Sequence, residues 1–293
     1  MHCFGILTHQ GRVLWLTLCV ICLFFLDAFS VRAQSTRSGD HLDAVEIAAI
    51  AVGSGGILFA GHTAASIDST KISLWNNPLP GEMAIERFLG GQYHPGKRNF
   101  LSGPIGGLAT PLVSLAGLCV IDASWGMGDT GELTAQDMFL FATGLGVNAG
   151  LTQLAKGIVA RPRPYVRLQN DTVGPVFTEG FRYDHQSFYS GHTSSAFFSV
   201  TYLNKRIRSI MRSRLTAGEC RDWNWLPPAM LYGWATFVGW SRIQSYEHYL
   251  SDVAVGALAG FLIAELFYSF NDDNETIYSR SSSPVIFRVT FSF

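Results

Sequence analysis

The chain has 293 residues, a formal net charge of −1, and 15% charged residues against 48% hydrophobic ones. Soluble domains average about 25% charged residues, so this composition indicates either a membrane protein or a very apolar helical bundle. The balanced charge argues against nucleic acid as a partner, and the length allows one or two domains.

Residues 1–33 have the pattern of an export signal. An apolar run over residues 13–25 follows a weakly basic start, and Val31-Arg32-Ala33 offers small residues where a signal peptidase cleaves. Asp27 interrupts the end of the segment, so an uncleaved anchor helix is the alternative. In both cases we expect the chain to enter the export pathway and to reside in the cell envelope.

Residues 34–103 are expected to hold one helix and an irregular segment. Leu42 to Ala65 is rich in Ala, Gly and Ile, which suits a helix that packs closely against its neighbours through small residues. Asn-Pro, Pro-Gly and His-Pro-Gly turn signals follow between Ile67 and Phe100. A short amphipathic helix from Met83 to Leu89 is expected among them.

Residues 104–270 are expected to form the main domain, an all-α, membrane-associated bundle of about six core helices. The apolar runs that define it are Pro104–Ser124, Gln136–Val159, His192–Asn204, Leu226–Trp240 and Val253–Phe270. A polar loop over residues 161–189 interrupts them, and loops of this length usually carry function. Residues 271–293 indicate a polar linker and then a short C-terminal strand, because Val285–Phe293 alternates with period two.

Three stretches of this domain carry residues suited to phosphate chemistry. In the first, Lys156 stands near the end of a predicted helix, and Arg161-Pro162-Arg163-Pro164 follows. The prolines stop the helix and keep the backbone extended, so Lys156 and Arg163 can converge on one anion. A basic helix terminus that complements the macrodipole is the alternative.

The second stretch is Ser190-Gly191-His192, which opens the next helix. Ser190 is a natural N-cap, and Gly191 lets a backbone N–H approach an oxyanion closely. Helix N-termini bind phosphate, and His192 in the first turn can donate a proton to a leaving oxygen. The alternative is an ordinary helix start with a histidine that has no chemical role.

The third stretch, Ser241–Asp252, places a guanidinium, an imidazole and a carboxylate within twelve residues. His248 and Asp252 are four residues apart, so they share a face if a helix begins near His248. The carboxylate can then accept the proton of one ring nitrogen and leave the other nitrogen its lone pair. Arg242 offers a fork of donors that suits a phosphate. A surface arginine and a helix-capping His/Asp pair are the alternative.

Together the three stretches resemble the three-part signature of the type 2 phosphatidic acid phosphatase and vanadium haloperoxidase superfamily. The matching positions are Lys156-x6-Arg163-Pro164, Ser190-Gly191-His192 and Arg242-x5-His248-x3-Asp252. The signature is specific because charged residues must fall at fixed offsets in a fixed order. Tyr189 departs from it, since the family usually has proline there. We expect this change to alter loop geometry or substrate preference and not to abolish activity.

The resemblance implies a role for each matching residue. His248 would be the nucleophile that forms a phosphohistidine, Asp252 would orient it, and His192 would protonate the leaving alcohol and then activate water. The groups that would hold the phosphate oxygens are Lys156, Arg163, Ser190, the Gly191 amide and Arg242. Fixed cations and helix-end amides stabilise the charge that spreads over the equatorial oxygens in phosphoryl transfer. No cofactor is implied, and no His or carboxylate cluster near the motifs has the spacing of metal ligands.

The expected function is therefore a metal-independent phosphatase that acts on a lipid phosphate or diphosphate, of the phosphatidic acid or isoprenyl diphosphate type. The alternatives are a soluble periplasmic non-specific acid phosphatase, a vanadium haloperoxidase, and a non-catalytic envelope protein that binds phospholipids. The expected partners are a phosphorylated lipid or a small phosphate ester, and the membrane.

The orientation in the membrane follows from the basic segment Lys205–Arg221, which lies between two apolar runs and away from the motifs. By the positive-inside tendency it would face the cytoplasm, and the site would face the periplasm or exterior. The runs over residues 192–204 and 226–240 are short against the roughly 20 residues that a span needs, so a soluble periplasmic protein remains the alternative.

Overall fold

The computed structural model describes residues 44–66, 74–90, 104–125, 130–173 and 181–270. The regular elements in these ranges are all helices: α2 (Ala44–Ser66), α3 (Glu82–Gly90), α4 (Pro104–Trp125), α5 (Thr130–Val159), α6 (Pro164–Val173), α7 (Phe181–Asp184), α8 (Gly191–Arg214), α9 (Ala217–Trp223), α10 (Leu226–Gln244) and α11 (Leu250–Tyr268). The prediction of an all-α bundle is confirmed for this part of the chain. The predicted signal or anchor over residues 1–33 and the predicted strand over residues 285–293 lie outside the described residues.

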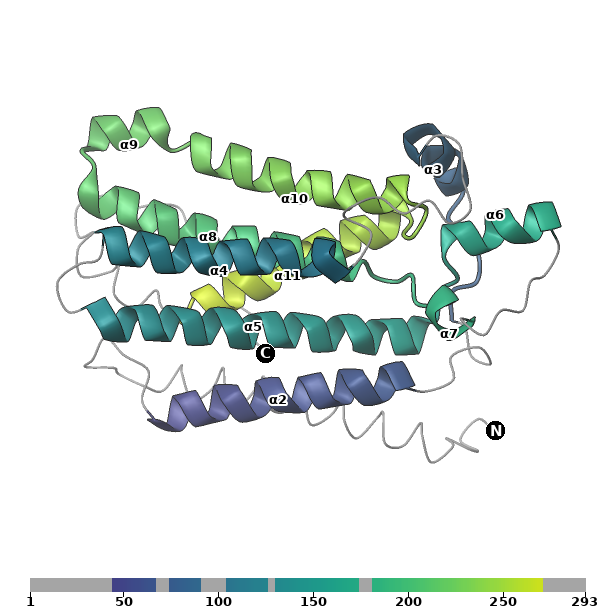
Figure 1. Ribbon diagram of the computed structural model, residues 1–293, viewed down its shortest axis with the longest axis horizontal. Coiled ribbons are helices and arrows are strands. Elements are labelled where there is room, and N and C mark those ends of the chain that lie inside the picture. Colours follow the sequence, from purple (N-terminus) through teal and green to yellow (C-terminus); the bar gives the residue numbers. More distant parts are fainter. Residues whose placement is uncertain (1–43, 67–73, 91–103, 126–129, 174–180, 271–293) are drawn as a thin grey trace, which may run out of the picture.

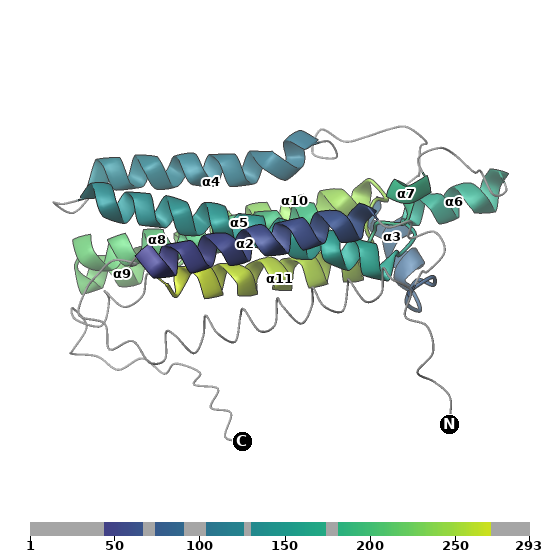
Figure 2. The same ribbon diagram turned by 90° about the horizontal axis from the view of Figure 1, so that it is seen from below.

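The long helices lie side by side along the long axis of the molecule, as Figures 1 and 2 show. Helix α8 is the central element, because it packs against α4, α5, α10 and α11, while α2 packs against α5. The short helices α3, α6 and α7 gather at one end of the bundle, and α9 lies at the opposite end (Figure 1).

Buried aromatic rings hold three of the long helices together. Phe141 of α5 lies 5.4 Å from Phe198 of α8, between ring centroids, and Tyr202 of α8 lies 5.2 Å from Tyr268 of α11. All four side chains are buried. Aromatic pairs of this kind contribute about 0.5–1.5 kcal/mol beyond the area that they bury. They fix the relative positions of the helices that carry the motifs at one end.

Glycines bring α11 into direct contact with the backbone of α8. A Cβ atom at Gly256 would lie 2.7 Å from the carbonyl oxygen of Ser190, and one at Gly260 would overlap the carbonyl oxygen of Ser194. Small residues four apart allow such close approach between helices in membranes. The beginning of α11 is thereby held against the beginning of α8.

Helix α2 confirms the expectation of close packing through small residues. A Cβ atom at Gly61 would overlap the backbone of Gly150 in α5, so the two helices touch through their glycines. The absence of side chains at this point lets the backbones meet.

Helix α8 is longer than the sequence indicated. We expected a helix over residues 192–204 followed by a basic loop, but the helix continues through the basic residues to Arg214 and spans 24 residues. Ion pairs at the side of the helix accommodate the charges: Lys205 pairs with Glu265 of α11 at 2.7 Å, and Arg206 pairs with Asp137 at 3.1 Å. Arg and Lys are also strong helix formers, so their charge alone did not indicate a loop.

The predicted polar loop over residues 161–189 also contains helices. Pro164, which was expected to keep the backbone extended, is the first residue of α6. Proline suits the first helical position because it needs no N–H partner there and its φ angle is already helical. The second short helix, α7, precedes the second motif.

Within the part of the chain that the structure describes, three helices are long and apolar enough to cross a membrane by length and composition: Ala44–Ala64, Ala135–Leu168 and Leu250–Tyr268. Large apolar side chains also face outward along the bundle; Phe59 and Val113 are each 71% exposed and Leu262 is 54% exposed. Exposed apolar surface on this scale is typical of a lipid contact. The chain is therefore associated with a membrane.

Candidate active site

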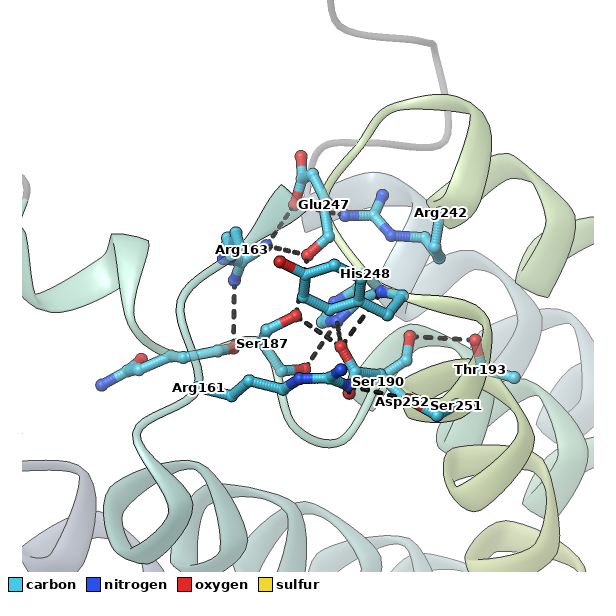
Figure 3. A network of polar contacts seen from close by, with 12 residues as sticks. Arg161, Arg163, Ser187, Ser190, Thr193, Arg242, Glu247, His248, Ser251 and Asp252 are labelled. Atoms are coloured by element: carbon cyan, nitrogen blue, oxygen red, sulfur yellow. Dashed lines mark hydrogen bonds and ion pairs between the residues drawn. The ribbon is translucent and has the colours of Figure 1, made fainter. Parts of the chain in front are cut away.

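The three sequence motifs meet at one end of the bundle, where α5 ends, α8 begins, and α10 gives way to α11 (Figures 1 and 3). Lys156 lies in the last turn of α5, and Arg163 lies in the short segment before α6. Arg242 lies in the last turn of α10, and His248 lies in the connection to α11. The predicted convergence of residues that are far apart in the sequence is thus found.

His248 is buried and held by a backbone carbonyl. Its Nδ1 atom lies 2.7 Å from the carbonyl oxygen of Ser187. A carbonyl oxygen can only accept, so Nδ1 carries the proton and Nε2 keeps its lone pair. Burial, together with the positive charges of Arg163 and Arg242, lowers the pKa of His248 well below its ordinary value of 6.5. The imidazole is therefore neutral at neutral pH.

Asp252 reaches His248 through Ser187 and not by a direct hydrogen bond. Its Oδ2 atom is 4.0 Å from Nδ1 of His248 but accepts from the Ser187 hydroxyl at 2.5 Å. Its Oδ1 atom pairs with Arg161 at 2.5 Å. The expected direct contact is not made, because the Ser187 carbonyl oxygen accepts from Nδ1 of His248 and the Ser187 hydroxyl donates to Asp252. Ser187, whose role the sequence did not indicate, connects the two motif residues (Figure 3).

Arg163 and Arg242 converge on one oxygen atom. The Oε2 atom of Glu247 lies 2.6 Å from Nη1 of Arg163 and 2.5 Å from Nη2 of Arg242. All three side chains are buried. Two guanidinium groups that share one anionic oxygen mark a place where a phosphate oxygen can be bound.

The start of α8 faces the end of α5. A Cβ atom at Gly191 would lie 3.0 Å from Cγ2 of Thr152, so the absence of a side chain lets the start of α8 approach α5 closely. The same Cβ atom would lie 3.7 Å from Nζ of Lys156, so this ammonium group lies beside the first residue of α8. The first-turn N–H groups of a helix have no partner within the helix and attract anions. Lys156 and the helix start are thus positioned to act together.

Ser190 stands at the N-cap of α8, as expected, but its side chain makes no capping bond. Its hydroxyl accepts from Thr193 at 2.9 Å, and its N–H donates to the carbonyl oxygen of Asp252 at 3.1 Å. Ser190 therefore ties the second motif to the third. His192, the second residue of α8, lies against α4, since its Nε2 atom would be 3.1 Å from a Cβ atom at Gly107.

A further set of contacts that the sequence did not predict connects α3 to the site. Arg161 stacks between the rings of Trp75 and Tyr249, 4.0 Å from each centroid, and donates to Glu82 at 2.6 Å. The same guanidinium group pairs with Asp252. Arg161 therefore joins α3 to the helix that follows His248.

The two buried carboxylates of α3 cap the N-terminus of α11. Glu82 accepts from the N–H and the hydroxyl of Ser251, at 3.2 and 2.5 Å, and Glu86 accepts from the N–H of Leu250 at 2.8 Å. Side-chain oxygens at a helix N-terminus satisfy its unpaired N–H groups, and the negative charge of Glu82 also suits the helix dipole. Burial raises the pKa of Glu86 to about 8. The sequence indicated only a short amphipathic helix here.

Tyr189, which stands where a proline was expected, is buried beside the second motif. The peptide bond between Phe188 and Tyr189 is cis. Burial raises the pKa of the Tyr189 hydroxyl, which bonds to Thr152 and Ser194. The substitution thus adds a polar contact between α5 and α8.

Comparison with known proteins agrees with the motifs. Residues 137–275 match the family model of the PAP2 superfamily, so the resemblance seen in the sequence is confirmed. The chain is 37% identical over 93 residues to the probable diacylglycerol pyrophosphate phosphatase 1 of Schizosaccharomyces pombe, covering 32% of this chain and 31% of that protein. It is 31% identical over 159 residues to phospholipid phosphatase 2 of Homo sapiens, covering 46% of this chain and 50% of that protein. The chain thus spans half or less of the length of these two relatives.

Among solved structures, the first transmembrane PAP2 type phosphatidylglycerolphosphate phosphatase from Bacillus subtilis aligns with a TM-score of 0.46 at 17% identity, covering 78% of this chain and 98% of that one. LpxE from Aquifex aeolicus aligns with a TM-score of 0.38 at 18% identity, covering 68% of this chain and 99% of that one.

Proposed function

We propose that this chain, whose residues 137–275 belong to the PAP2 superfamily, is a phosphatase that removes phosphate from a lipid phosphate or a lipid diphosphate. The observation that carries the proposal is the meeting of Arg163 and Arg242 at one oxygen position next to His248. Two guanidinium forks beside a buried, neutral imidazole provide the anion clamp and the nucleophile that phosphoryl transfer needs.

In this proposal the phosphate is bound between the arginines and the start of α8. Arg163 and Arg242 bind oxygens from one side, and Lys156 and the Gly191 N–H bind oxygens from the other. Ser190, at the N-cap, offers its hydroxyl to the same group. Fixed donors of this kind stabilise the charge of the transition state without reorganisation, which is usually the largest contribution to catalysis.

The proposed reaction has two steps. Nε2 of His248 attacks phosphorus, the bond to the leaving alkoxide breaks, and His192 gives that oxygen its proton. His192, now neutral, takes a proton from water, and the water oxygen attacks phosphorus and breaks the bond to Nε2. Inorganic phosphate leaves, and both histidines return to their starting states. Asp252, through Ser187, keeps the Nδ1 proton of His248 in place throughout.

Two observations support a lipid substrate. The bundle exposes apolar side chains along its length, so a lipid-embedded substrate can reach the end of the bundle by diffusion within the membrane. The two curated relatives are named for diacylglycerol pyrophosphate and phospholipid. Phosphatidic acid and isoprenyl diphosphate are the substrate classes that we propose.

We further propose that the site faces the periplasm or exterior. The basic end of α8, with Arg208, Arg212 and Arg214, joins α9 at the end of the bundle opposite the site (Figure 1). Trp223 and Trp225 are exposed at the same end, as is typical of a membrane–water interface. By the positive-inside rule this end belongs to the cytoplasm.

The test is phosphate release by the purified protein in EDTA. Phosphatidic acid, an isoprenyl diphosphate and a soluble aryl phosphate would be compared, with His248→Ala beside the wild type. Release that persists in EDTA and disappears in His248→Ala is the expected result, with a lipid preferred over the aryl phosphate.

His62→Ala is the matched control, since His62 is an exposed histidine of α2 and its loss should leave the rate unchanged. Equal release by His248→Ala and wild type, or no release from any substrate, would contradict the proposal. Preference for the aryl phosphate would assign a soluble substrate instead.

A further inference from the structure

Glu247 occupies the point at which the proposed phosphate clamp closes. Its Oε2 atom accepts from Arg163 at 2.6 Å and from Arg242 at 2.5 Å, and the hydroxyl of Tyr183 lies 3.5 Å from the same atom. The side chain is only 7% exposed. In Figure 3 the carboxylate lies between the two guanidinium groups and above His248.

A carboxylate in this position imitates a substrate oxygen. Carboxylate and phosphate oxygens use the same guanidinium geometry, so Arg163 and Arg242 cannot bind both with the same donors. The residue is also covalently next to the nucleophile, His248. A phosphate that binds the same two donors near His248 must therefore replace Glu247 on them.

We infer that Glu247 is a specificity-determining residue that competes with the substrate phosphate for Arg163 and Arg242. This inference rests on the proposed function, because it concerns the same site. Glu247 stabilises the empty site by pairing buried cations, which are costly to leave unpaired. A phosphate that carries more negative charge than one carboxylate displaces Glu247 from the two arginines.

The competition has two consequences for turnover. One carboxylate neutralises half of the charge of the two guanidinium groups, which weakens the binding of any phosphate, including the product. Return of Glu247 to the arginines also favours release of inorganic phosphate after hydrolysis. Glu247 therefore lowers the affinity for phosphate and speeds the release of the product.

The alternative role for the same contacts is a scaffold that only aligns the two arginines. The two roles predict opposite effects of Glu247→Gln. If Glu247 competes with phosphate, its replacement by a neutral side chain leaves both arginines available, and the affinity for phosphate rises. If Glu247 only aligns the arginines, the weaker contact in Glu247→Gln lets them move apart. The affinity for phosphate then falls and KM rises.

The test is calorimetric binding of inorganic phosphate to the full chain in detergent, without turnover. Glu247→Gln should bind phosphate about tenfold more tightly than wild type, because a nearby like charge at these distances is worth about one decade in affinity. Glu265→Gln removes the same charge from α11 at its pair with Lys205 and should leave the affinity unchanged. Arg242→Gln should bind phosphate weakly or not at all.

Glu247→Asp provides a second variant if the glutamine form fails to fold. It keeps the charge but shortens the reach by one methylene, and phosphate should bind more tightly than to wild type. In active protein, both variants should also show stronger inhibition by product phosphate and a lower KM.

Unchanged or weaker phosphate binding in folded Glu247→Gln would overturn the inference, and so would a change of equal size in Glu265→Gln. If phosphate release is normal while Glu247→Gln binds phosphate as wild type does, only the inference is lost. If the wild type releases no phosphate from any substrate while Glu247→Gln still gains affinity, the inference is supported and the proposed function is lost.

Discussion

The carbonyl oxygen of Ser187 lies 2.7 Å from Nδ1 of His248, so a backbone group holds the imidazole ring. The hydroxyl of the same serine donates to Asp252. Ser187 is thus the residue through which the carboxylate acts on the imidazole, and its two functional groups can be separated by mutation.

Ser187→Ala removes the hydroxyl but keeps the carbonyl. We expect kcat to fall about tenfold with little change in KM, since a hydrogen bond to a charged group is worth about 1.5 kcal/mol and phosphate contacts are unaffected. Steady-state kinetics would measure the change. Ser213→Ala, whose hydroxyl bonds only its own helix at the far end of α8, should leave kcat unchanged. A KM effect larger than the kcat effect would contradict the positioning role of Ser187.

Arg161→Lys tests the bridge between α3 and Asp252. Lysine cannot donate to Glu82 and Asp252 in the fixed geometry of a guanidinium group, and it cannot stack between Trp75 and Tyr249 as a plane. A disrupted buried ion pair costs about 3–5 kcal/mol, so the melting temperature and kcat should both fall. Thermal unfolding in detergent and kinetics would measure this.

Arg208→Lys is the control, since Arg208 pairs with Asn224 in an exposed position at the opposite end of the bundle. Wild-type stability of Arg161→Lys would show that α3 does not depend on this bridge.

Glu86→Gln should change stability in a manner that depends on pH. The pKa of Glu86 is raised from its ordinary value of 4.5 to about 8, so the folded state keeps a proton that the unfolded state releases. The contribution of Glu86 to the stability of the folded state is fully present below pH 4.5, and it is lost as the pH rises towards 8. Glutamine carries no such penalty and can still accept from Leu250.

The melting temperature of Glu86→Gln should therefore match that of the wild type near pH 5 and exceed it near pH 8.5. Glu265→Gln, a partly exposed change on α11, should show no such divergence. An equal difference at both pH values would contradict the burial of a protonated Glu86.

Gly260→Ala tests the contact between α11 and α8. A methyl group there would overlap the carbonyl oxygen of Ser194, so the helices must separate, at a cost of about 1–3 kcal/mol. Gly233→Ala in α10 is a matched control, because a Cβ atom at Gly233 meets nothing within 4 Å. Alanine should there stabilise the helix by about 0.5–1 kcal/mol. Equal effects of the two changes on the melting temperature would contradict the close crossing.

The sequence predicted the fold class and the meeting of the three motifs for a clear physical reason. Lys156 at a helix end, Ser190 before a helix and His248 between two apolar runs are all marked by local helix signals. When helices of a bundle alternate in direction, such ends gather at one side. The shared location itself was expected from the resemblance of the three stretches to the superfamily signature, and the helix ends give that expectation a physical basis.

The contacts that could not be predicted depend on residues far apart in the sequence or on backbone atoms. Glu82 and Glu86 have the pattern of a solvated helix face, and only the packing of α3 against α11 buries them. The Ser187 carbonyl has no sequence signal, because every residue has a carbonyl. Glu247 lay inside a recognised motif, but a carboxylate beside a phosphate site carries no local sign that it pairs with the arginines.

The proposed mechanism depends most directly on a covalent bond between phosphorus and His248. Rapid acid-free quenching of the enzyme with a ³²P-labelled lipid phosphate, followed by peptide mass spectrometry, would detect it. We predict an acid-labile, base-stable label on His248 of the wild type, and no label at this position in His248→Ala. A label on another residue, or none in the wild type while phosphate is released, would contradict the proposed mechanism.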